Sequence, residues 1–379
     1  SGAATAPAAS GDCPQPTGDE KTLNLILIPS PSADSIKHFI PDFEKANPGV
    51  KVNVEEVDYG TAHQKELLSI RQKQGAWDIA QYDNTYLPPF GAGKLMTPLD
   101  GCLASSTAYD IADFRQGFQD YSKFNGVTYG LMLSTEPMVQ WYRTDIYDEL
   151  GLKPAKTWDE FTANAKAVKD SGKGDGVVLG WGPNVDWWWW SICWSEGGKL
   201  YDEQFKPHVN EAPCVKAIEY MKSMLQYGPD GGISANGDDV TAKFLSTDIG
   251  AMLNYSGYWG WTLDPAKNKH AGKLATAPMP IGTTDITHLA GWNIGIPADA
   301  KNPGLAWKFL EFVLGKANAK AFLESGAAAI GRDSIIKDPE MLKKYTYLSA
   351  LDIPPTSRIE RYPQLDARER ALATGLKLE

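Results

Sequence analysis

Residues 21–29, KTLNLILIP, are an almost continuous apolar run, and residues 50–57, VKVNVEEV, alternate between apolar and polar side chains. Both patterns are typical of β-strands. Between them, Ser30, Ser32 and Asp34 offer the side chains that cap a helix start, and Asn47-Pro48-Gly49 would end that helix. The stretch therefore predicts a strand, a helix and a second strand.

The same alternation continues along the chain. We expect a helix from about Thr61 to Gln74 and a short strand at residues 77–80, WDIA. Strands that alternate with helices in this way form a parallel sheet with helices on both faces. The pattern changes at residues 127–151, VTYGLMLSTEPMVQWYRTDIYDELG, where two strand-like runs indicate that the chain leaves one lobe for another. Pro278-Met279-Pro280 is a natural second crossing.

Composition excludes several classes of protein. The 379 residues suffice for about two to three domains, and the longest apolar runs are far shorter than the ~20 residues of a membrane span. The 47 acidic and 37 basic residues give a net charge of -10 without a basic stripe, so we expect no nucleic-acid partner. The 13 tryptophans are unusual, because such large aromatic side chains are either buried or used for binding.

Four widely spaced cysteines carry no CxxC pair and no zinc-binding spacing, which argues against a metal site. We expect two disulfides, Cys193–Cys214 within one lobe and Cys13–Cys102 clipping the N-terminal arm. Four buried free thiols in a cytosolic protein are the alternative. Residues 1–18 are small and polar, so we expect a flexible tether like the arm that follows the lipidated cysteine of a membrane-anchored protein.

Two aromatic clusters are candidates for a binding surface. The side chains of Trp187-Trp188-Trp189-Trp190 cannot all enter one core, since on a helix they span the whole circumference. Residues 255–261, YSGYWGW, place glycines beside rings and so expose ring faces. A ring face stacks against the apolar face of a sugar, although ordinary core packing is the alternative for any single tryptophan.

Signals for catalysis are weaker. No GxSxG, HExxH or Walker A motif is present, and five scattered histidines do not form a ligand set. We expect no cofactor and no metal. Carboxylates are numerous enough to hide a glycosidase pair, which only geometry would reveal.

Four blocks, in the right order, resemble a known family. Residues 77–100 carry WDIAQYD, GKL and PLD, and residues 129–160 carry YGL, YRTD, LGL and TWDE, the most specific block. Residues 251–261 carry AML and GYWGW, and residues 291–312 carry GWN and AWKFLEF. These blocks resemble the extracellular solute-binding proteins of carbohydrate ABC importers, the group that includes maltose- and multiple-sugar-binding proteins.

The resemblance implies a two-lobe α/β fold of the periplasmic-binding-protein type, each lobe a mainly parallel sheet flanked by helices, with the ligand held between the lobes. The ranges it suggests are 19–131 with 280–328 for the N-terminal lobe and 132–279 with 329–379 for the C-terminal lobe. Hinge strands would cross near Leu131–Glu136, Pro278–Pro280 and Gly326–Gly331.

The resemblance and the aromatic clusters together give a set of expected ligand contacts. Asp83 and Glu136 would accept hydrogen bonds from sugar hydroxyls, and Trp259 would stack on the sugar. Gly331-Arg332 stands where the family usually has a proline before the arginine. The full set is Asp83, Glu136, Trp187, Trp188, Trp259, Trp261, Trp292, Asn293 and Arg332.

The implied function is a non-enzymatic, monomeric receptor that captures a di- or oligosaccharide and delivers it to the membrane permease of an ABC importer. It would act outside the cytoplasm, periplasmic or lipid-anchored on the outer face of the membrane. Two alternatives stay open at this point. One is a carbohydrate-active hydrolase or lyase, and the other is a binding protein for a phosphorylated polyol, for which Arg143 and Arg332 would supply the cations.

Overall fold

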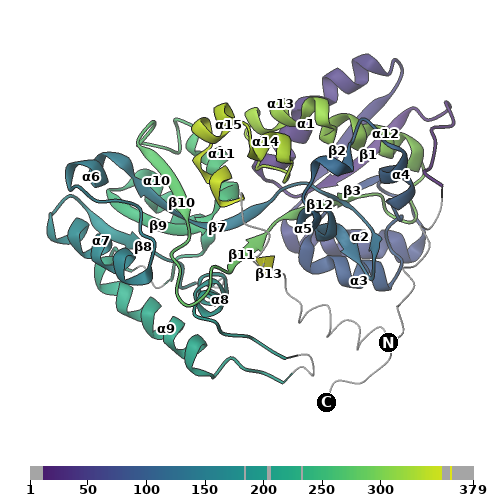
Figure 1. Ribbon diagram of the computed structural model, residues 1–379. Helices are drawn as coiled ribbons and strands as arrows, with labels where there is room; N and C mark the ends of the chain where they lie inside the picture. The colour runs from purple at the N-terminus through teal and green to yellow at the C-terminus, as the bar shows by residue number, and fades with distance from the viewer. Residues whose placement is uncertain (1–11, 183–184, 203–205, 232–233, 352–358, 361–379) are drawn as a thin grey trace. The chain divides into compact units, whose positions relative to one another are not determined.

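The computed structural model describes residues 12–182, 185–202, 206–231, 234–351 and 359–360 (Figure 1). These residues form two compact units. Unit 1 holds the described residues up to Thr135 and the segment Gly291–Ile335, and unit 2 holds Glu136–Ala290 and the described residues from Ile336 on. Each unit has its own sheet with flanking helices, as the sequence predicts.

The sheet of unit 1 has five strands in the order β2-β1-β3-β12-β6. β1 (Thr22–Leu27) runs parallel to β2 (Lys51–Glu56) and to β3 (Ile79–Asp83), as the strand and helix alternation predicts. β12 (Trp292–Gly295) is antiparallel to β3 and to β6 (Leu131–Met132). β12, from late in the chain, therefore completes a sheet whose other strands all come from the first 135 residues.

Helices cover both faces of this sheet (Figure 1). α1 (Pro31–Ala46) begins where the Ser30 side chain accepts a hydrogen bond from the Ala33 amide, and it packs through Phe43 on Phe309 of α12 (Pro303–Leu314). α2 (Tyr59–Gln72) and α3 (Leu87–Ala92) lie on the other face. The apolar cluster beneath them contains Ile26, Ala62, Ile70, Ala80, Tyr82, Leu87 and Phe90.

The sheet of unit 2 is built around β7 (Glu136–Arg143). This strand is antiparallel to β9 (Ile249–Tyr255), β10 (Leu274–Pro278) and β11 (Thr287–Ala290). β8 (Asp175–Val178) is parallel to β9, and β13 (Ile359–Glu360) is parallel to β11. Among the described strands of this sheet, β7 therefore runs against all the others, as β12 does in unit 1, and the sheet of each unit is mainly parallel, as expected.

The helices of unit 2 include α7 (Trp158–Asp170), α8 (Val185–Ser195), α9 (Ala212–Met224), α10 (Gly237–Ser246) and the short α11 (Trp259–Thr262). α7 begins at the Thr157 side chain, which accepts a hydrogen bond from the Glu160 amide. α10 begins with a reciprocal capping box between Asn236 and Asp239. Such side-chain caps fix where a helix can start.

The passages between the units lie at Thr135/Glu136, Ala290/Gly291 and Ile335/Ile336. The first falls within the predicted crossing at residues 131–136. The second lies after Pro278–Pro280, because β10 and β11 both pair with β7 and keep residues 274–290 in unit 2. The third lies after Gly326–Gly331, because Arg332 is anchored in unit 1.

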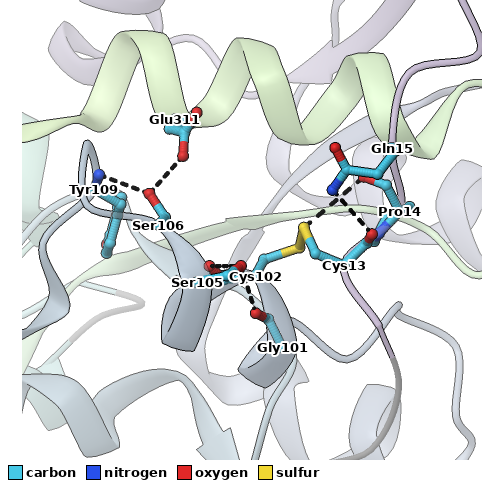
Figure 2. The surroundings of a disulfide bond; sticks show 9 residues. All are labelled: Cys13, Pro14, Gln15, Gly101, Cys102, Ser105, Ser106, Tyr109 and Glu311. Carbon is cyan, nitrogen blue, oxygen red and sulfur yellow. Dashed lines mark hydrogen bonds between the residues drawn. A yellow bond between two sulfur atoms is a disulfide. The ribbon is translucent and has the colours of Figure 1, made fainter.

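Two disulfides use all four cysteines in the predicted pairing, Cys13–Cys102 and Cys193–Cys214. Figure 2 shows Cys13 joined to Cys102 on α4 (Asp100–Ser105). Beside it, the backbone of Gln15 passes so close to Gly304 that a Cβ at that glycine would come within 2.2 Å of it. The end of the expected tether is therefore held against unit 1, whereas residues 1–11 lie outside the described residues. Within the described ranges, no helix has the length and apolar character of a membrane span.

Candidate functional site

Three aromatic side chains of unit 2 gather where strands end and helices begin. Trp187, in the first turn of α8, is partly exposed, and its ring lies 5.2 Å from the ring of Tyr255 at the end of β9. Gly237, the first residue of α10, lies beneath both Trp187 and Tyr258. A Cβ there would come within 2.7 Å of the Trp187 ring and 3.0 Å of the Tyr258 hydroxyl. We call Trp187, Tyr255 and Tyr258 the aromatic wall, in which Trp187 and Tyr258 are partly exposed and Tyr255 is buried.

Carboxylates adjoin the aromatic wall. The Tyr258 hydroxyl donates a hydrogen bond of 2.7 Å to Asp238. Glu136, the first residue of β7, lies against Gly257, where a Cβ would come within 2.3 Å of its carboxylate. Burial, the charge of Asp238 and its hydrogen bond, and the charge of Glu136 together raise the pKa of Tyr258, so its hydroxyl stays protonated.

Asp186 is the residue directly before Trp187, in the first turn of α8. It is partly buried, and burial raises its pKa above the usual value. Ring faces next to carboxylate acceptors suit a solute with C–H faces and hydroxyl donors. The sequence predicts Trp187 and Glu136 in this role, and the structure brings the two to the same end of the sheet of unit 2.

The other tryptophans of the run on α8 point in different directions. Trp188 is fully buried, and its indole N–H donates a 2.7 Å hydrogen bond to the carbonyl of Leu253 in β9. Its ring also occupies the space that a side chain at Gly180 would need. Trp188 is therefore a core residue, and the expectation that it contacts ligand is wrong. Trp189 turns to α9, where its N–H donates to the carbonyl of Cys214 at 2.8 Å.

Trp259 also packs inside unit 2. Only 8% of its surface is exposed, and its ring lies 5.5 Å from Trp141 and 5.6 Å from Tyr347. The structure thus gives Trp259 a packing role in place of the expected sugar platform. Trp261 is partly exposed, and the ammonium group of Lys267 lies 4.6 Å above its ring.

In unit 1, two of the expected ligand residues are neighbours across β3 and β12. Asp83 is the last residue of β3 and pairs in register with Trp292, which is partly exposed. The Asp83 carboxylate accepts a 2.8 Å hydrogen bond from the Thr85 amide and so begins the 3-10 turn η1 (Asn84–Tyr86). Asn293 is fully buried, and its amide donates to Asn84 at 3.4 Å. Asn293 therefore supports this strand end from within.

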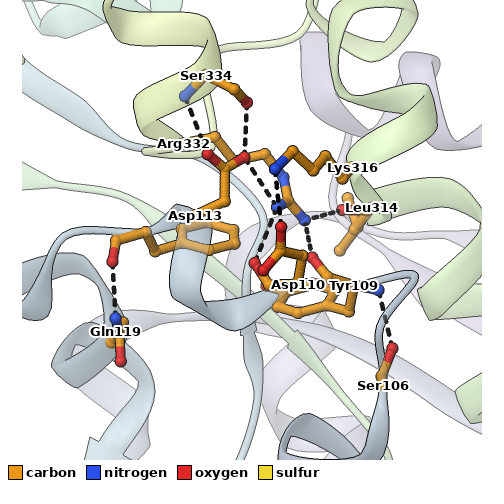
Figure 3. A network of polar contacts seen from close by, with 10 residues as sticks. Ser106, Tyr109, Asp110, Asp113, Gln119, Leu314, Lys316, Arg332 and Ser334 are labelled. Carbon is orange, nitrogen blue, oxygen red and sulfur yellow. Dashed lines mark hydrogen bonds and ion pairs between the residues drawn. The ribbon is translucent and has the colours of Figure 1, made fainter.

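Arg332 is a structural anchor of unit 1 (Figure 3). Its side chain is fully buried and donates hydrogen bonds of 2.7 Å to the carbonyls of Tyr109 and Leu314. It also contacts Asp113 at 3.4 Å, and its guanidinium lies 4.3 Å from the centre of the Phe114 ring. The expected ligand contact of Arg332 is wrong, because its hydrogen bonds and its ring contact all hold segments of unit 1 together.

Sequence reasoning omitted four residues of this region: Tyr255, Tyr258, Asp186 and Asp238. Both tyrosines stand in the YSGYWGW stretch, a candidate binding surface by sequence, of which the expected ligand set contains only the two tryptophans. Asp238 stands in the first turn of α10, directly after the Asn236-Gly237 helix start. Among the described residues, no group of three His, Cys, Asp or Glu side chains could hold a metal ion.

Comparisons with known proteins agree with this architecture. The family profile of the bacterial extracellular solute-binding protein matches residues 29–320. The mannitol-binding protein of Pseudomonas aeruginosa is 22% identical over 350 residues, which cover 89% of this chain and 78% of that protein. The erythritol/L-threitol-binding protein of Mycolicibacterium smegmatis is 23% identical over 337 residues, covering 81% and 69%.

Among solved structures, the ABC transporter solute-binding protein of Agrobacterium radiobacter K84 in complex with ribitol gives a TM-score of 0.80. It is 23% identical, and the match covers 95% of each chain. The likeness confirms the predicted two-lobe α/β fold.

Proposed function

Because this chain belongs to the family of bacterial extracellular solute-binding proteins, we propose that it is the receptor of an ABC importer for a neutral sugar or sugar alcohol. The observation that carries the proposal is the aromatic wall of unit 2 with Glu136 and Asp238 beside it. Relatives named for mannitol and erythritol support the same class of solute.

A neutral solute is favoured over a phosphorylated polyol. The two arginines that would serve an anion already have partners. Arg143 is paired with Asp145 at 2.8 Å and with Asp248 at 3.2 Å, and Arg332 is enclosed in unit 1. Both guanidinium groups are buried, and freeing either would break its hydrogen bonds, which is costly.

The solute we propose has the size of a sugar alcohol or a monosaccharide. The expectation of a di- or oligosaccharide depended on several tryptophan rings that stack on the sugar. Trp188 and Trp259 are buried in unit 2, so fewer rings are accessible to a solute. The aromatic wall retains one partly exposed tryptophan, Trp187. Larger sugars stay in the test panel as the competing class.

We further propose that the protein acts outside the cytoplasm, anchored through its N-terminal arm, and hands the solute to a membrane permease as a monomer without catalysing a reaction. Two disulfides support this location, since disulfides persist in oxidising compartments. The family description, extracellular solute-binding, supports both the location and the absence of catalysis.

A thermal-shift screen followed by calorimetry tests the proposal. The panel contains ribitol, mannitol, erythritol, glucose, maltose and glycerol 3-phosphate. Ligand at 100 times its Kd should stabilise the fold by roughly 2.7 kcal/mol, which shifts the melting temperature measurably. A response to glycerol 3-phosphate alone would favour the anionic alternative, and release of monosaccharide from maltose over hours would indicate a hydrolase.

A further inference from the structure

Two side chains of α2 hold buried polar atoms in unit 1, although only Glu66 is a buried residue and His63 is partly exposed. Glu66 is 1% exposed, and His63 lies one turn earlier on the same helix. Within the part of the chain that the structure describes, both Glu66 oxygens and the His63 Nδ1 atom are buried without a hydrogen-bond partner. Buried polar atoms in folded proteins nearly always have a partner, so this pair requires an explanation.

The position of the pair links it to the strand end that carries Asp83. The His63 ring stacks on the ring of Tyr86, with the ring centres 3.5 Å apart and the planes 12° apart. Tyr86 closes the turn that Asp83 begins, and both Tyr86 and Trp292 pack on the apolar cluster beneath α2. Asp83, Trp292 and the α2 pair thus share one region of unit 1.

Burial favours the neutral form of both side chains. Burial raises the pKa of Glu66 well above its usual value, which favours the carboxylic acid form with one O–H donor and one carbonyl acceptor. Burial and then the charge of Arg71 lower the pKa of His63, so its ring has one N–H and one bare nitrogen. The pair can therefore both donate and accept hydrogen bonds without burying a charge.

We propose that His63 and Glu66 form a hydroxyl-binding subsite, in which a hydroxyl of a neutral polyol fills the unpaired hydrogen-bonding positions. A hydroxyl both donates and accepts, which matches a neutral acid beside a neutral imidazole. An ordered water is the competing occupant, because it offers the same groups. The inference rests on the proposed function and adds to it the residues of α2 that recognise the solute.

Four variants test the subsite by calorimetry with mannitol and ribitol. His63→Phe keeps the stack on Tyr86 but removes the nitrogens, and Glu66→Leu removes both oxygens. Glu66→Gln keeps a donor and an acceptor, and Leu68→Gln changes a residue of the same helix that is 53% exposed. The subsite predicts a loss of affinity of about ten-fold or more for His63→Phe and Glu66→Leu, with Glu66→Gln and Leu68→Gln near wild type.

Melting temperatures of the unliganded variants separate binding from folding. Glu66→Leu should melt no lower than wild type, since it removes two unpaired buried oxygens. Unchanged affinity in His63→Phe and Glu66→Leu would overturn the subsite and identify the occupant as water. If Glu66→Leu fails to fold, the affinity of His63→Phe for mannitol and ribitol tests the subsite by itself. Wild-type protein that binds no neutral sugar or polyol would instead overturn the proposed function, and the subsite with it.

Discussion

Truncating Trp259 to alanine should damage the fold and spare the binding. The ring is 8% exposed and lies within 6.1 Å of Trp141, Tyr345 and Tyr347, so its removal leaves a cavity that several aromatic side chains line. Replacing a buried tryptophan by alanine costs about 3–5 kcal/mol. At about 2–4 °C per kcal/mol for a unit of this size, the melting temperature should fall by roughly 6–20 °C.

Differential scanning calorimetry of the unliganded protein measures this loss, and titration with mannitol at a temperature where the variant is folded measures the affinity. Trp261→Ala is the matched control, because this ring lies in the same helix, is partly exposed and packs under Lys267. Its melting temperature should fall by a few degrees at most. A Trp259→Ala protein with near-native melting and a thirty-fold loss of affinity would refute the packing role and restore the sugar platform.

Trp187→Ala should have the opposite effect, weakening binding of the solute by about thirty-fold while melting near wild type, as calorimetry would show. Replacing Cys193 and Cys214 by alanine should cost about 2–4 kcal/mol in a urea titration, and the wild-type cysteines should resist alkylation without reductant. The raised pKa of Glu66 makes the folded protein lose stability as the pH rises above about 4.5, because this carboxyl group ionises more readily in the unfolded chain than in its buried position. Between about pH 4 and 8, the melting temperature of Glu66→Gln should therefore change less with pH than that of the wild type. An equal change in both proteins would contradict the burial argument. Arg332→Ala should lower stability by about 3–5 kcal/mol in urea without changing the affinity for solute, whereas a folded variant that no longer binds would return Arg332 to the site.

Local features of the chain were predictable because they depend on neighbours in sequence. The strand, helix and strand order from residue 21 to residue 83 follows from hydrophobic periodicity, and the helix start at Ser30 follows from side-chain capping. The disulfide pairing was also expected from spacing and lobe membership, and the structure confirms it.

Features set by distant contacts were harder to predict. Pro278 looks like a place where the chain leaves a lobe, yet β10 ends there and β11 returns to the same partner strand. The run of tryptophans on α8 shows by its spacing that the rings diverge. Which ring faces the core depends on a contact distant in sequence, the hydrogen bond from the Trp188 indole to the Leu253 carbonyl. Arg332 has no local signal at all, because its partners come from segments near residues 109–113 and 314.

The discontinuity of unit 1 has a consequence for the order in which the protein is made. Its sheet needs β12, and its buried arginine arrives only at residue 332, after nearly all of unit 2 has been synthesised. A nascent chain that ends before β12 leaves β3 without its antiparallel neighbour, and one that ends before residue 332 leaves Asp113 without its cation. The first 135 residues should therefore stay unfolded on their own, and unit 1 should become protease-resistant only when the ribosome has released the segment around Arg332.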